Sequence, residues 1–144
     1  MSKIGNTILA WGYKLLADRG NAEAQYTLGI MYYTGKKVIE DKKEAMRRYK
    51  IAANQGYAPA QHLLGLEYAL GKVVPKDTGE AVRWVKLSAD QGYPKAKCLL
   101  AGYYLYGVGI PKDLIKAKQL AREGFEAGEE SCKKVLDSVM FGDE

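Results

Sequence analysis

The stretch Gly20-Asn-Ala-Glu-Ala-Gln-Tyr-Thr-Leu-Gly29 decides the fold, because it returns twice at an interval of 36 residues. The copies are Gly56-Tyr-Ala-Pro-Ala-Gln-His-Leu-Leu-Gly65 and Gly92-Tyr-Pro-Lys-Ala-Lys-Cys-Leu-Leu-Ala101, and a weaker fourth copy begins at Gly128. Residues 20–55 and 56–91 are identical at 17 of 36 aligned positions. A fixed period of this length is typical of solenoids, in which each small unit buries its apolar face against its neighbours.

Each repeat is predicted to form two antiparallel helices, A and B. Helix A is expected at four places, which are residues 22–34, 59–70, 94–106 and 129–140. A glycine after helix A indicates a left-handed C-terminal cap, and an aspartate six residues later indicates the N-cap of helix B. These residues are Gly35, Gly71 and Gly107, and Asp41, Asp77 and Asp113. Gly29 and Gly65 lie in mid-helix, where glycine costs roughly 1 kcal/mol relative to alanine, so they predict a close approach of helix B.

The repeats cover nearly the whole chain, which is therefore predicted to be a single solenoid domain, 1–144. Residues 6–19 match helix B without a helix A before it, and residues 128–144 hold a lone capping helix A. The complete repeats are 20–55, 56–91 and 92–127. We expect an all-α, right-handed α-solenoid of antiparallel helix pairs.

The repeated residues resemble Sel1-like repeats, a relative of the tetratricopeptide repeat with a 36-residue unit. The matching positions of the first repeat are Ala22, Ala24, Gln25, Leu28, Gly29, Tyr32, Gly35, Val38, Asp41, Ala45, Ala52, Ala53 and Gly56. The resemblance implies an adaptor, a scaffold or an immunity protein that neutralises a toxin. Exported cysteine-rich members carry a Cys pair in each repeat, which Cys98 and Cys132 do not reproduce, so penicillin hydrolysis is not carried over.

Composition indicates a soluble protein. The net charge is +5, hydrophobic residues make up 47%, and no run of 18 apolar residues predicts a membrane span. The first residues lack the pattern of a signal peptide, so we expect a cytoplasmic protein. In that reducing compartment, Cys98 and Cys132 are expected to be two thiols rather than a disulfide.

The segment 36–50 holds seven basic and three acidic residues. It favours either an acidic protein partner or a solvated helix face with internal ion pairs. Nucleic acid is a weaker interpretation, because no aromatic residues alternate with these charges.

No set of residues predicts catalysis, a metal or a cofactor. His62 is the single histidine, and nothing in the spacing brings a nucleophile and an acid to it. Ser131-Cys-Lys-Lys134 fits the short Ser-x-x-Lys pattern by chance. Trp84 aligns with Arg48 at a position expected to point outward, where it would serve as a partial anchor or pack under basic side chains. We expect a protein that is not an enzyme.

The A helices offer the best candidate binding surface, since they line the concave face in the tetratricopeptide fold. Apolar and aromatic residues outside the repeat pattern are expected to face a protein partner there. They are Tyr26, Ile30, Tyr33, His62, Leu66, Leu70, Leu105 and Tyr106. The alternative is self-association through the N-terminal helix and Trp11, although a monomer is favoured. A hydrolase of the cysteine-rich type is a distant third.

Overall fold

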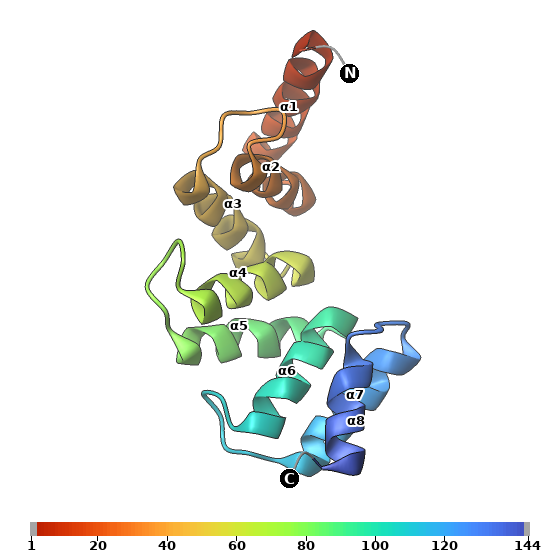
Figure 1. Cartoon of the computed structure of the whole chain (residues 1–144). Helices are drawn as coiled ribbons and strands as arrows, with labels where there is room; N and C mark the ends of the chain where they lie inside the picture. The colour runs from red at the N-terminus through yellow and green to blue at the C-terminus, as the bar shows by residue number, and fades with distance from the viewer. Residues whose placement is uncertain (1–2, 143–144) are drawn as a thin grey trace. The chain divides into compact units, whose positions relative to one another are not determined.

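The computed structural model describes residues 3–142, and this part of the chain contains only helices, with no strand. The helices follow one another along the chain as Figure 1 labels them. They are α1 (Lys3–Asp18), α2 (Ala22–Thr34), α3 (Lys42–Asn54), α4 (Ala58–Leu70), α5 (Thr78–Asp90), α6 (Pro94–Tyr106), α7 (Leu114–Glu126) and α8 (Cys132–Phe141). The predicted all-α class is confirmed. The chain forms two compact units, and the division falls between Leu64 and Gly65, within α4.

The predicted helix A bounds agree with α2 and α6, and α4 begins one residue earlier than expected. The last helix differs more, because α8 begins at Cys132 rather than at 129. Ser131 explains the delay: its hydroxyl donates to the Glu129 carboxylate at 2.7 Å, and its backbone N–H lies 3.4 Å from the same oxygen. Such local side-chain bonds compete with the helical turn.

The predicted caps are present. The glycines that follow helix A have φ values of 67°, 65° and 68° at Gly35, Gly71 and Gly107. Each capping aspartate accepts a hydrogen bond at 3.0 Å from the backbone N–H three residues later. Because these bonds satisfy donors that the helix leaves open, each B helix begins at a defined residue.

Close approach at the mid-helix glycines is also confirmed. A Cβ on Gly29 would meet the Tyr49 ring and would lie 3.3 Å from the Ala45 carbonyl oxygen of α3. A Cβ on Gly65 would lie 3.1 Å from the Ala81 carbonyl oxygen of α5. Only glycine lets the two helices of a pair come this close.

Buried glutamines fix the register between successive helices. The side-chain amide of Gln25 donates to the Ala17 carbonyl of α1 at 3.0 Å. Gln61 makes the equivalent bond to Ala53 of α3 at 3.2 Å. The repetition of this bond after 36 residues shows that α1 holds the register of a B helix, as predicted.

The outward placement of Trp84 and Arg48 is wrong. Trp84 is 4% exposed and Arg48 is 6% exposed. The Trp84 indole donates to Glu80 at 3.1 Å, and the Arg83 guanidinium lies 4.2 Å from its ring centre. The alternative prediction, that Trp84 packs beneath a basic side chain, agrees with this arrangement.

The expectation of two free thiols is also wrong, because Cys98 of α6 and Cys132 of α8 form a disulfide. Both residues are buried, and their Cα atoms lie 4.8 Å apart. A Cβ on Gly124 of α7 would collide with the Cys132 sulfur and would lie 2.9 Å from the Cys98 sulfur. The aligned positions carry Ala52 and Ser88, so the missing side chain at Gly124 makes room for the disulfide.

Candidate partner-binding groove

Four of the predicted binding residues lie in the first unit, and all four are half-buried. Two of them belong to an aromatic cluster, because the rings of Tyr26 and Tyr33 lie 6.2 Å and 6.5 Å from the ring of buried Tyr49. Tyr26 also meets Tyr57 edge to face at 5.4 Å. These tyrosines therefore stabilise the α2–α3 pair, in addition to any role on a surface. The other two are Ile30 and His62.

The other four predicted residues lie in the second unit. On α4, Leu66 is half-buried and Leu70 is 55% exposed. At the end of α6, Tyr106 is 68% exposed, whereas Leu105 belongs to the buried core. The Leu105 side chain therefore packs mainly within the core of the second unit, and its role in binding stays a prediction.

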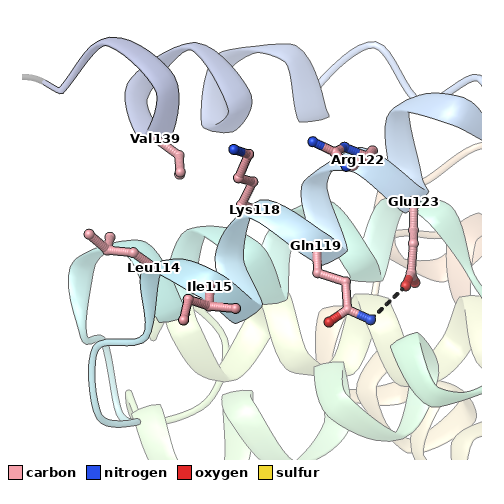
Figure 2. A pocket seen from close by; sticks show the side chains of 7 residues that line it. All are labelled: Leu114, Ile115, Lys118, Gln119, Arg122, Glu123 and Val139. Atoms are coloured by element: carbon pink, nitrogen blue, oxygen red, sulfur yellow. Dashed lines mark hydrogen bonds between the residues drawn. The ribbon is translucent and has the colours of Figure 1, made fainter.

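Two adjoining hollows lie between parts of α6, α7 and α8, and we call them together the α7–α8 groove. The larger hollow has a volume of about 600 Å³ and is drawn in Figure 2. Its lining consists of Leu114, Ile115, Lys118, Gln119, Arg122, Glu123 and Val139. The smaller hollow has about 260 Å³, shares Leu114 and Val139 with the larger one, and adds the predicted residues Leu105 and Tyr106.

The groove lies where a lysine occupies a position that holds a core residue in the other repeats. In the first unit, Ala10 of α1 and Met31 of α2 share a buried core. The corresponding pair in the second unit is Val82 of α5 and Tyr103 of α6, again in one core. After a further 36 residues, the pair becomes Lys118 and Val139. A lysine does not remain buried without a partner, so the contact opens into a hollow.

The charge in the groove is positive. The negative charge of Glu123 is balanced by a neighbouring cation. Lys97 of α6 donates a hydrogen bond to its carboxylate at 2.7 Å, and Gln119 donates a second at 3.2 Å. The hydrogen bond from Lys97 is the main cause that holds the pKa of Glu123 below its usual value. Figure 2 shows Gln119 and Glu123 bonded to each other away from α8, while Lys118 reaches toward α8. Lys118 and Arg122 thus add two positive charges beside an apolar lining.

The basic segment 36–50 is partly neutralised in the structure. Glu44 accepts hydrogen bonds from Arg47 at 2.6 Å and from Arg48 at 2.8 Å, and Lys42 lies 3.5 Å from Glu40. The pairs that Lys42 and Arg47 form lie at the surface and contribute little stability, whereas Arg48 is buried. These pairs reduce the field that the segment presents, and its attraction for an acidic partner stays a prediction.

The residues considered for chemistry are dispersed. The Ser131 hydroxyl is bonded to Glu129, and the intervening Cys132 is held in the disulfide. Within residues 3–142, no three His, Cys, Asp or Glu side chains gather as a metal site would require. In the same range, the structure has no helix with the length and apolar character needed to cross a bilayer.

The residues that line most of the groove were not predicted from the sequence, and they are Leu114, Ile115, Lys118, Arg122 and Val139. The predicted binding residues belong to A helices, whereas the groove lies mainly on a B helix. A signal was available: Lys118 replaces two buried apolar residues, Met46 and Val82, at the same repeat position.

Comparisons with known proteins agree with this architecture. A family model described as the Sel1 repeat matches residues 22–57, 58–93 and 94–129. A Sel1 repeat protein from Oxalobacter formigenes is 34% identical, with a TM-score of 0.83 over 89% of this chain and 96% of that one. A protective antigen of uropathogenic Escherichia coli with an SLR fold is 35% identical, with a TM-score of 0.86 over 92% of this chain, but the match spans only 28% of that protein.

Helicobacter pylori cysteine-rich protein B shares the fold, with a TM-score of 0.72 and 17% identity over 94% of this chain and 98% of that one. No curated protein sequence matches the chain.

Proposed function

The chain belongs to the Sel1 repeat family, and on that premise we propose that it is a protein-binding module whose partner inserts a segment into the α7–α8 groove. Sel1 repeats generally mediate protein–protein interaction, and the fold is typically a scaffold rather than an enzyme. The main support for the proposal is the position of Lys118. This cation lines the groove at a place where the other repeats have a core residue.

The lining of the groove indicates the chemistry of the bound segment. Leu114 and Ile115 are 47% and 83% exposed, which is unusual for large aliphatic side chains on a short stretch of helix. Lys118 and Arg122 stand one helical turn apart on the same helix. We expect a segment that combines aliphatic or aromatic side chains with carboxylates, because it would cover the apolar surface and pair with both cations.

Selection of displayed peptides on the immobilised protein tests this proposal. Peptides that combine acidic and apolar residues should be enriched, and calorimetry should then give the affinity of a synthesised peptide. The double variant Lys118→Glu/Arg122→Glu should weaken binding by about tenfold or more, since two charge-assisted contacts become repulsive.

The matched control is Lys72→Glu/Lys95→Glu, which changes the net charge equally at exposed positions outside the groove lining. It should bind the peptide within about twofold of the wild type, apart from a small long-range effect that salt screens. Equal loss of binding in both double variants would show that net charge, rather than the groove, attracts the peptide, and the proposal would fail.

The finer roles depend on the partner. An adaptor would hold a segment of a cellular protein, whereas an immunity protein would cover a toxin, and either fits an acidic and apolar segment.

A cytoplasmic location stays a prediction from the sequence. The buried disulfide instead favours a compartment that permits oxidation, and fractionation of the source cells with thiol labelling would decide between the two.

A further inference from the structure

An exposed apolar stripe runs along α1 and does not belong to the groove. Its members are Ile4, Ile8, Trp11 and Leu15, with exposed fractions of 73%, 63%, 66% and 40%. The spacing of four, three and four residues places them on one side of the helix, as in the contact line of a two-helix coiled coil. The opposite side of α1 carries Ala10 and Ala17, which are buried in the core shared with α2.

The repeat does not require apolar residues at the two central positions of this stripe. One repeat later, Ile8 and Trp11 align with half-buried Glu44 and exposed Arg47, which form an ion pair at 2.6 Å. A second repeat later the pair is Glu80 and Arg83, at 3.0 Å. These positions of a B helix therefore carry charged side chains at its solvent edge, half-buried for the glutamates and exposed for the arginines, even where its helix A is present. On α1 the same two positions have become isoleucine and tryptophan, so a function other than packing within the repeat explains them.

A helix A in front of α1 would not cover the stripe. Helix A covers the B helix positions of Ala45 and Ala52, which are completely buried in α3. The residues of α1 in that register are Leu9 and Leu16. They lie on a different side of the helix from Ile8 and Trp11. A preceding helix A would therefore leave the stripe exposed, and a different element would have to cover it.

We propose that the stripe is a self-association surface, on which α1 packs antiparallel against α1 of a second copy of this chain. The spacing reads the same in both directions, so an antiparallel pair brings Ile4 opposite Leu15 and Ile8 opposite Trp11 of the other copy. A contact of this kind is isologous and closes as a dimer. A parallel pair would instead place two Trp11 rings opposite each other and two Lys14 charges on the same side.

Two further observations fit this occupant. Gly12 flanks the stripe, and a Cβ there would meet nothing within 4 Å, so nothing in the described chain requires a glycine at this place in the helix. A helix packed across it would approach the backbone closely. The four side chains expose on the order of 500 Å² per copy, and a dimer would bury about 1,000 Å², the lower limit for specific interfaces. Interfaces near this limit are typical of weak, transient association.

Sedimentation velocity of the full chain, from micromolar to several hundred micromolar, tests the proposal. The wild type should shift toward twice the monomer mass as its concentration rises. Ile8→Glu and Trp11→Glu should each remain monomeric at the highest concentration. Ile39→Glu is the matched control, because Ile39 is 91% exposed in the same unit but lies outside the stripe, and it should dimerise like the wild type. Circular dichroism verifies that each variant is folded.

Cysteine cross-linking tests the orientation. The native cysteines are bonded to each other, so introduced cysteines are free to react. Ile4→Cys/Leu15→Cys should form a disulfide-linked dimer on mild oxidation, whereas Ile4→Cys alone should not. A wild type that is monomeric at all concentrations would overturn the proposal, as would dimerisation of Trp11→Glu. So would a monomer whose Trp11 emission shifts only with phosphatidylcholine vesicles, because the occupant would then be a lipid surface.

Discussion

The missing side chain at Gly124 should be essential for the disulfide, and Gly124→Ala is the perturbation that tests this. A methyl group there would collide with the Cys132 sulfur and crowd the Cys98 sulfur at 2.9 Å and the Pro94 carbonyl oxygen at 3.3 Å. None of these atoms is the free end of a flexible side chain. Overpacking of this kind costs about 1–3 kcal/mol, whereas alanine gains roughly 1 kcal/mol over glycine in a helix. We expect a net loss of up to about 2 kcal/mol.

Gly102→Ala is the matched control. Gly102 also lies inside a helix of the second unit, but a Cβ there would meet nothing within 4 Å. That variant should gain up to about 1 kcal/mol. Because both variants share this gain, they should differ by the cost of overpacking alone, about 1–3 kcal/mol in the free energy of unfolding. Urea titration followed by circular dichroism, under conditions that keep the disulfide intact, measures the difference.

A thermodynamic cycle identifies the cause. In the background Cys98→Ala/Cys132→Ala, the sulfur atoms are gone, and Gly124→Ala should no longer destabilise the protein. The reasoning is refuted if Gly124→Ala is as stable as Gly102→Ala in the oxidised protein. It is equally refuted if the loss persists without the cysteines.

Three further predictions concern stability. Reduction of Cys98–Cys132, whose sequence separation is 34 residues, should lower the free energy of unfolding by about 3–4 kcal/mol in the chain-entropy model, and denaturant titration with and without a phosphine reductant measures it. Gly65→Ala should be less stable than Gly102→Ala by about 1–3 kcal/mol, because its methyl group would press on Val85 and the Ala81 carbonyl; thermal melts of the two variants measure this difference, and equal stability would contradict it. The hydrogen bond from Arg47 is the main cause that lowers the pKa of Glu44 from its usual 4.5, so its stabilisation is complete above that pH and is lost as the pH falls through the lower pKa of the folded state. Glu44→Gln should therefore show a shallower acid-induced loss of stability than the wild type, and equal slopes would contradict the assignment.

The fold could be predicted from the sequence because the period is expressed in residues with a local conformational role. Gly35 and Asp41 mark the end of one helix and the start of the next, and their copies recur after 36 residues. Gly29 marks the contact between two helices of a pair. Signals of this kind depend on backbone geometry, which each repeat reproduces.

Side-chain burial was harder to predict. Arg48 is charged, yet its guanidinium is buried and bonded to Glu44 at 2.8 Å and to the Gln25 amide oxygen at 2.9 Å. The charge of Arg48 therefore led to the wrong prediction that this position, and with it the aligned Trp84, points outward. The burial of Leu105 was not predicted either, because this position lies outside the repeat pattern and still belongs to the core.

The disulfide was missed because its cysteines occupy different repeat positions. Cys98 aligns with His62, whereas Cys132 aligns with Ala96, so the period itself gives no reason to pair them. The sign that does point to the pair is Gly124, where the two earlier repeats carry a side chain. Its meaning depends on how three helices meet, which a comparison of single positions does not show.

The central claim is that the α7–α8 groove receives a segment of a partner protein. Amide chemical shifts recorded while a selected acidic and apolar peptide is added to the isotope-labelled protein test it most directly. The largest shifts should fall on Leu114, Ile115, Arg122 and Val139. Shifts concentrated on Tyr26, Ile30 and Tyr33 of α2, with the groove residues unchanged, would contradict it.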